Sequence, residues 1–295
     1  MEYSLFDAHC DTLLKVFAQN ENLYDCPFEV NIQKLEKFKK ATQVFAIFNK
    51  GSLSKKDILK ICEILKKSKI NFITNTKNLS KINAMVSIEG LGNTPDLTPA
   101  DIDDYYEAGI RIISLTWNQN NPLCGGISEN NEGITSCGKK ILSKMDKLNM
   151  VLDVSHISEK GFFDCFENFD GTIIATHSNA KKVCTHPRNL TDEQFMHIKS
   201  RGGVAGINLY PLFLNNSEYA YAKDAIKHIE HFLALGGENN IGIGADFDGI
   251  DYTMKDIYDV SKMDILFNEM KKLNYSDDII DKISHKNFEN IFKFN

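Results

Sequence analysis

Short apolar runs rich in β-branched residues recur at a steady pace along the 295-residue chain. Eight such runs lie at residues 4–8, 42–48, 84–88, 111–116, 151–155, 172–176, 203–209 and 241–245. Most of them are continuous apolar stretches, whereas a strand with one solvent-exposed face alternates apolar and polar residues. The pattern therefore predicts eight strands buried on both faces, as in a parallel sheet.

Between these runs, apolar residues recur at helical spacing on otherwise polar segments. Helices are predicted at residues 32–40, 55–67, 99–109, 138–149, 158–169, 191–200 and 222–236, with a last helix at 276–294. Strands that alternate with helices in this way predict an α/β fold, a (β/α)8 TIM-type barrel. An open doubly wound sheet is less favoured, because it usually needs a Gly-rich phosphate turn after its first strand, and residues 9–15 (HCDTLLK) have none. No repeat or linker divides the chain, so residues 1–295 are predicted to form a single domain.

Histidines and carboxylates stand at the points where the predicted strands end. Six side chains share this position: His9, Asp11, Glu89, His156, His177 and Asp246. In a parallel barrel the C-terminal ends of the strands meet at one mouth, so residues far apart in sequence converge there. Three histidines and three carboxylates in one mouth predict a metal site that supports hydrolysis.

The spacing assigns provisional roles within this cluster. His9 and Asp11 lie two residues apart on an extended chain, so both face the same side and can hold one ion. Any one of these residues alone has an ordinary explanation, such as a buried histidine bonded to backbone or a surface glutamate. Together they favour Glu89 as a carboxylate that bridges two ions, and the mix of imidazole and carboxylate favours zinc. Asp246 is either another ligand or the base that takes a proton from the bridging water, and the sequence leaves both open.

Two further segments are predicted to contact a substrate. Arg188 is one of only three arginines and lies in a loop between Pro187 and Asn189. A guanidinium can form a two-pronged contact with a substrate carboxylate, although an ordinary surface cation is the alternative. Residues 117–138 form a long polar, Gly-rich segment after the fourth strand, and long loops at this face of a barrel usually help to build the substrate site.

Charge and composition narrow the class of protein. The net charge of −6 provides no basic patch for nucleic acid. No apolar run is long enough to cross a bilayer, and the N-terminus does not read as a secretory signal. The seven cysteines are odd in number and scattered, which favours reduced thiols and a cytoplasmic location. Cys10 lies between two predicted ligands but should point away from them and pack in the core.

These motifs together resemble the membrane dipeptidase (renal dipeptidase) family of zinc peptidases, within the amidohydrolase-like barrels. The matching segments run in family order through almost the whole chain: FDAHCDTL (6–13), SIEG (87–90), GIRIISLTWN (109–118), the long segment 132–158, ATHSNA (175–180), HPRNLTDEQ (186–194), GINLY (206–210) and GADFDGI (244–250). The pattern resembles the bacterial-type soluble members, and we expect the family's membrane anchor to be absent from this protein.

The resemblance implies a role for each motif residue. It implies two zinc ions, one held by His9, Asp11 and Glu89 and the other by Glu89, His156 and His177. It further implies proton transfer by Asp246, and binding of the substrate's terminal carboxylate by Arg188 together with Tyr210. Asn118 is also predicted to bind the substrate. In one departure from the animal members, which read LTH, this chain reads LTW and so has Trp117 in place of a histidine that contacts the scissile carbonyl. We therefore expect metal coordination to stabilise most of the oxyanion.

The expected function is that of a zinc-dependent dipeptidase, in which a metal-bridging hydroxide attacks the peptide carbonyl and Asp246 relays the proton. Tolerance of a C-terminal D-residue and a homodimeric state are implied by the family alone. The alternative is another dimetal hydrolase on the same barrel, acting on a cyclic amide, a lactone or a phosphoester. The cyclic-amide version is disfavoured because the fourth strand carries no lysine at its C-terminal end to serve as a bridging ligand. A catalytically silent barrel is also disfavoured, since every expected position is filled.

Overall fold

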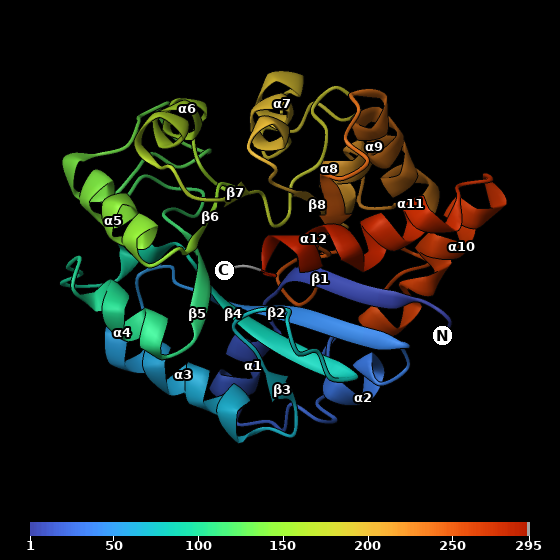
Figure 1. Cartoon of the computed structure of the whole chain (residues 1–295), viewed down its shortest axis with the longest axis horizontal. Helices are drawn as coiled ribbons and strands as arrows, with labels where there is room; N and C mark the ends of the chain where they lie inside the picture. The colour runs from blue at the N-terminus through green and yellow to red at the C-terminus, as the bar shows by residue number, and fades with distance from the viewer. Residues whose placement is uncertain (294–295) are drawn as a thin grey trace.

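The computed structural model describes residues 1–293 and contains a nearly closed barrel of eight parallel strands, shown in Figure 1. The barrel strands are β1 (Ser4–Cys10), β2 (Lys40–Phe48), β4 (Ile82–Glu89), β5 (Ile110–Ser114), β6 (Val151–Asp153), β7 (Ile173–Ile174), β8 (Ala205–Ile207) and β9 (Ile241–Ile243). Neighbours pair in the order β7-β6-β5-β4-β2-β1-β9-β8, and a parallel bridge between Ala175 and Ala205 joins the two ends. The predicted barrel is therefore confirmed.

The predicted strands are all present, but their lengths differ from the prediction. β6 to β9 have only two or three residues each, because the chain leaves the ladder early and continues into buried loops. A ninth strand, β3 (Asn71–Phe72), was not predicted; it pairs with the start of β4, outside the barrel path.

Helices surround the barrel on its outer side (Figure 1). They are α1 (Thr12–Gln19), α2 (Ile32–Leu35), α3 (Lys55–Lys67), α4 (Asp101–Glu107), α5 (Ser136–Lys147), α6 (Glu159–Asn168), α7 (Asp192–Ser200), α8 (Pro211–Asn215), α9 (Ala222–Ala234), α10 (Asp264–Lys272), α11 (Asp277–Asp281) and α12 (Asn287–Ile291). The predicted helix at 32–40 is wrong beyond Leu35, since Lys40 already begins β2, and α1, α8 and α10 were not predicted. The predicted last helix is α11 and α12 joined by a π turn at Lys282–Lys286; residue 294, its predicted end, lies outside the described residues.

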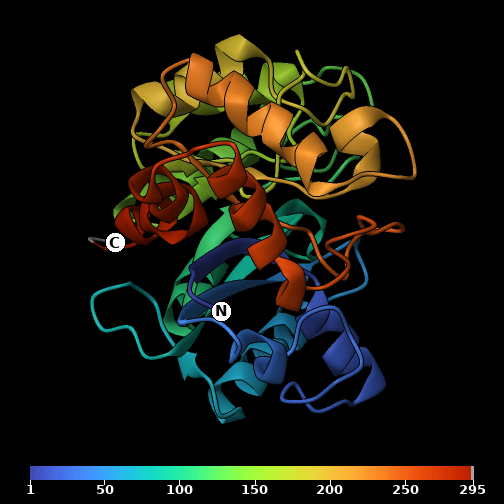
Figure 2. The ribbon, with the colours of Figure 1, turned by 90° about the vertical axis from the view of Figure 1, so that its right-hand side faces the viewer.

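Apolar side chains fill the N-terminal end of the barrel. Phe6, Val44, Met85 and Ile112 belong to one buried cluster inside it, together with Val151 of β6 and Ile174 of β7. Two phenylalanines at the C-terminus of the chain, Phe288 and Phe292, join this cluster, with ring centroids 5.4 and 5.8 Å from that of Phe6. Figure 2 shows the red C-terminal helices packed beside the blue strand β1. The last helix thus closes this end of the barrel.

A bulge in β1 changes which way its side chains point. Asp7 pairs with Gln43 but Cys10 pairs with Phe45, so one extra residue is inserted on the β1 side. Ala8 accordingly belongs to the cluster inside the barrel, whereas Cys10, two residues on, belongs to the core between barrel and helices. Bulges of this kind re-aim side chains, and this one allows His9 to face the mouth. The prediction that Cys10 packs away from the site is confirmed.

Within residues 1–293, no helix combines the length and the apolar character that a membrane span requires.

Candidate metal centre

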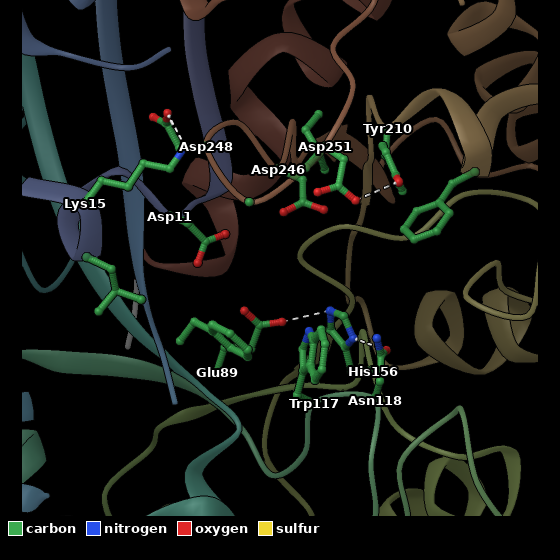
Figure 3. A pocket seen from close by; sticks show the side chains of 15 residues that line it. Asp11, Lys15, Glu89, Trp117, Asn118, His156, Tyr210, Asp246, Asp248 and Asp251 are labelled. Carbon is green, nitrogen blue, oxygen red and sulfur yellow. Dashed lines mark hydrogen bonds and ion pairs between the residues drawn. The ribbon is translucent and has the colours of Figure 1, made fainter. Parts of the chain in front are cut away.

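All six residues predicted at strand ends converge at the C-terminal mouth of the barrel. Figure 3 shows four of them, Asp11, Glu89, His156 and Asp246, around one space. Three sets of three ligand atoms lie within 4.8 Å of one another, namely His9–Asp11–Glu89, Glu89–His156–His177 and His9–Asp153–His177. All three are buried, and Glu89 belongs to the first two, which are the two ligand sets of the predicted site.

Glu89 reaches the two sets with different oxygens. Its Oε2 lies 3.5 Å from His9 Nε2, and its Oε1 lies 2.8 Å from His156 Nε2. Asp11 Oδ2 is also 3.5 Å from His9 Nε2, while His177 Nε2 is 3.8 Å from Glu89 Oε1 and 2.8 Å from His156 Nε2. A carboxylate that presents one oxygen to each ligand set has the geometry of a bridge between two ions.

The bonding state of His9 fits a metal ligand. Its side chain is buried, yet neither Nδ1 nor Nε2 has a hydrogen-bond partner among residues 1–293. Buried polar nitrogens normally have such a partner, and a metal ion satisfies an imidazole nitrogen in its place. The combination of imidazole nitrogens with carboxylate oxygens is one that zinc accepts.

Burial and mutual charge shift the pKa values of the ligands in opposite directions. Burial lowers the pKa of His156 to about 4 and that of His177 well below its ordinary value, in both cases helped by nearby positive charge. Burial also lowers the pKa of His9, but the nearby carboxylates of Glu89 and Asp11 outweigh burial. They raise the pKa of His9 well above the usual range. Burial would raise the pKa of Glu89, but its electrostatic and hydrogen-bond interactions with His156 and His9 hold it well below normal. His156 and His177 are therefore neutral and carry the lone pairs that metal ligation needs.

Asp246 follows β9 in a fixed orientation. Its backbone is left-handed (φ 66°), its amide donates to the carbonyl of His9 at 3.1 Å, and its Oδ2 accepts from Asn208 Nδ2 at 2.9 Å. The other oxygen, Oδ1, lies 3.8 Å from His9 Nε2. Burial, with the charges of Asp11 and Glu89, outweighs His9 and raises the pKa of Asp246 to about 7. A carboxyl with this pKa suits general acid–base chemistry near neutral pH.

Gly249 allows the loop after β9 to close over these carboxylates. A Cβ atom there would lie 2.1 Å from Asp11 Oδ2 and 2.8 Å from Asp246 Oδ1. Any larger residue would displace a carboxylate from the mouth.

A pocket of about 470 Å³ opens above the two ligand sets (Figure 3). Its walls combine aromatic side chains, including Phe48, Trp117 and Phe213, with the charged Lys15 and Asp251. The volume is in the range of small-molecule sites, and apolar walls with a few polar groups are typical of such sites.

The three predicted substrate-binding residues occupy different places. Tyr210 lines the pocket, and its hydroxyl is 3.5 Å from Asp251 Oδ2. Asn118 also lines it, but its Oδ1 lies 2.8 Å from Nδ1 of His156 and so contacts a ligand directly. Arg188 is only 5% exposed and does not belong to the pocket wall. Its Nη1 donates to the carbonyl of Ser155 and its Nη2 to that of His177 at 3.3 Å, which leaves Nε without a partner in the described part of the chain.

Sequence reasoning missed three buried polar residues beside the ligands. Asn208 holds Asp246, while Asp153 and Thr176 lie behind His177, with Thr176 Oγ1 at 2.7 Å from His177 Nδ1. The signal was present for Asp153, since a charged residue in the predicted strand 151–155 must be buried. Its partner lies 23 residues away, however, and no local pattern identifies it.

A parallel (β/α)8 barrel whose C-terminal mouth gathers histidines and carboxylates in two sets has the architecture of metal-dependent hydrolases. The chain matches the family model described as "Membrane dipeptidase (Peptidase family M19)" over residues 1–294, and it belongs to this family. Membership places the chain among metallopeptidases, hydrolases that act on peptide bonds.

Individual proteins resemble the chain over about three quarters of its length. A Klebsiella pneumoniae protein from the region 5′ of pqqA is 33% identical over 226 residues, which is 72% of this chain and 82% of that protein. The "dipeptidase C965.12" of Schizosaccharomyces pombe is 31% identical over 74% of this chain, but the match covers only 54% of the yeast protein. The chain thus spans about half the length of that relative.

A Rhodobacter sphaeroides metallopeptidase, solved with a phosphinate mimic of the dipeptide L-Ala-D-Ala, shares the fold. Its TM-score is 0.86 at 20% identity, with 99% of both chains covered.

Proposed function

We propose that this protein is a zinc-dependent dipeptidase with two ions, whose substrates include dipeptides with a C-terminal D-residue. One ion would be held by His9, Asp11 and Glu89, and the other by Glu89, His156 and His177. The position of Glu89 carries this proposal, because its two carboxylate oxygens face two separate ligand sets, at 3.5 Å from His9 and 2.8 Å from His156.

Bound zinc would polarise the peptide carbonyl and lower the pKa of water at the site. The protein's own residues then handle the proton. Asp246 takes it from the attacking water and delivers it to the departing amine, and Asn208 keeps Oδ2 engaged so that Oδ1 remains available. A pKa raised to about 7 by burial supports both halves of this transfer near neutral pH.

The pocket supports a short substrate. Its volume of about 470 Å³ suits a dipeptide better than a long chain, and it is walled by Trp117, Phe48 and Tyr210. Arg188 is assigned to the terminal carboxylate of the substrate, to which its Nε would donate, since Nε has no partner among residues 1–293. The choice of L-Ala-D-Ala as a test substrate is supported by the mimic that the R. sphaeroides relative binds.

The test is hydrolysis of L-Ala-L-Ala, L-Ala-D-Ala and L-Ala-L-Ala-L-Ala by zinc-loaded protein, chelated protein and the zinc-loaded Asp246→Asn variant. We expect cleavage of both dipeptides, none of the tripeptide and none after chelation, with a loss of about 10²- to 10⁴-fold in Asp246→Asn. Protein that holds two metal ions but cleaves no dipeptide would overturn the proposal, and the cyclic amide, lactone and phosphoester would be the next substrates.

We also propose a cytoplasmic location and a homodimeric state. The location is supported by the seven cysteines, which are free thiols and, apart from Cys137, buried. The dimer rests on the family resemblance, and light scattering of the purified protein tests it.

A further inference from the structure

Behind His177, away from the pocket, lies a buried chain of three polar groups. His177 Nδ1 is 2.7 Å from Thr176 Oγ1, and Thr176 Oγ1 is 2.6 Å from Asp153 Oδ2. The three side chains are 4% exposed or less. This contact chain runs from the ring of a ligand to a carboxylate inside the barrel.

The positions of the hydrogen atoms along these contacts follow from which groups can donate a hydrogen bond. Asp153 Oδ1 already accepts from the amides of Ser155 and Thr176 at 3.0 and 2.9 Å, and from the Ser155 hydroxyl at 2.6 Å. Among residues 1–293, its Oδ2 has one hydrogen-bond partner, the Thr176 hydroxyl. A carboxylate only accepts, so the single hydroxyl hydrogen of Thr176 points to Asp153. The contact from Thr176 Oγ1 to Ser155 Oγ is longer, 3.2 Å, and competes poorly for it.

The direction of the Thr176 hydrogen bond determines which ring nitrogen of His177 carries the proton. Because the Thr176 hydrogen is committed to Asp153, Thr176 Oγ1 accepts from the ring, and the proton of neutral His177 must sit on Nδ1. The lone pair is then on Nε2, the nitrogen that faces Glu89 and His156. We propose that Asp153 and Thr176 are positioning residues that fix the ring tautomer of His177 for metal binding; this inference rests on the proposed metal site.

Removing the charge of Asp153 should reverse the chain of hydrogen bonds. In Asp153→Asn the amide oxygen must stay with the two backbone N–H groups, so the NH₂ group would face Thr176 Oγ1. The Thr176 hydroxyl would then donate to His177 Nδ1 and move the ring proton to Nε2, where it blocks ligation. Thr176→Val leaves Nδ1 without an acceptor and Asp153 Oδ2 without its donor. Its effect on zinc affinity is milder, because no group then donates to Nδ1 and both tautomers can form.

The experiment compares zinc affinity and ring tautomer in wild type and three variants at the contact chain, with a fourth variant as control. Zinc affinity is measured by competition with a chelator, and the His177 tautomer by ¹⁵N NMR of the apo protein. We expect affinity to fall about 10-fold in Thr176→Val and about 100-fold in Asp153→Asn, with Thr176→Ser near wild type because it keeps the hydroxyl. The ring proton should be on Nδ1 in wild type and Thr176→Ser, and on Nε2 in Asp153→Asn.

Thr42→Val is the matched control. Thr42 is fully buried in β2 at the opposite end of the barrel, where its Oγ1 accepts from Asn83 at 3.4 Å. It should lose stability without loss of zinc affinity. Equal affinity in wild type, Thr176→Val and Asp153→Asn would overturn the inference, as would an unchanged tautomer in Asp153→Asn. Wild-type protein that binds no zinc but keeps the Nδ1 proton would instead count against the proposed function alone.

Discussion

The two ends of the barrel are made by the same eight strands but are filled in opposite ways. At the N-terminal end, Phe6 packs on Phe288 and Phe292 within an apolar cluster. At the C-terminal end, histidines and carboxylates are buried almost as deeply, and His9 has no hydrogen-bond partner among the residues described. Burial of apolar surface stabilises the fold, whereas burial of charge costs free energy unless ions or hydrogen bonds offset it. One end therefore stabilises the molecule, and the other is ready to bind cations.

The largest effect is expected at Glu89. Glu89→Gln removes the charge that both ligand sets share, and several kcal/mol of metal assistance should be lost with it. A loss of about 4 kcal/mol corresponds to a fall in dipeptide hydrolysis of about 10³-fold. Activity and metal content are measured together on the same preparation. Full activity with two ions bound would refute the bridging role of Glu89.

At the apolar end, Phe288→Ala should act on stability instead. Truncation of a buried phenylalanine costs about 3–5 kcal/mol, and Phe288 also contacts Gly242, where a Cβ would lie 2.3 Å from the ring. We expect this loss in urea unfolding, with zinc affinity unchanged. A large change in zinc affinity would show that the two ends are energetically coupled, and would contradict the separation of fold stability and metal binding between them.

Metal removal should affect stability through the C-terminal end. At a free zinc concentration of 100 times Kd, binding stabilises the folded protein by about 2.7 kcal/mol. For a chain of this length, that difference corresponds to a rise of about 4 °C in Tm. Thermal unfolding with zinc and with chelator measures it. The same shift is expected in Phe288→Ala, and no shift in Glu89→Gln.

The smallest effect concerns Glu29, beside the mouth. Burial and the charge of Asp248 raise the pKa of Glu29 to about 7. The backbone amide of Asp248, which donates to Glu29 Oε2 at 2.6 Å, acts in the opposite direction but is outweighed. The folded protein therefore binds more protons than the unfolded chain between about pH 4.5 and 7, and stability falls as pH rises through this window. Allowing for solvent screening, we expect a loss of roughly 1 kcal/mol that is absent in Glu29→Gln.

Urea unfolding of chelated protein at pH 5 and pH 8 checks the Glu29 prediction. Glu21→Gln, an exposed site in the same region, is the control and should behave as wild type. If wild type and Glu29→Gln lose the same stability between the two pH values, Glu29 does not titrate in this window.

Much of the fold could be predicted because it depends on local patterns. Continuous apolar runs marked all eight barrel strands, and strand ends marked the six candidate ligands. The errors have physical causes. The segment 32–40 has helical periodicity, yet Lys40 joins β2 because pairing with Ser4 of β1 outweighs local preference. β3 is too short, at two residues, to give a periodic signal.

The sequence by itself determined the class of fold and which side chains gather at one mouth, because strand burial and strand order follow from the spacing of apolar residues. Only the tertiary structure decided how those side chains are aimed. The bulge between Asp7 and Cys10 turns His9 inward, and Asp153 meets Thr176 across 23 residues of chain. Register shifts and hydrogen bonds between separate strands depend on how those strands meet in space, and no local pattern of residues encodes that.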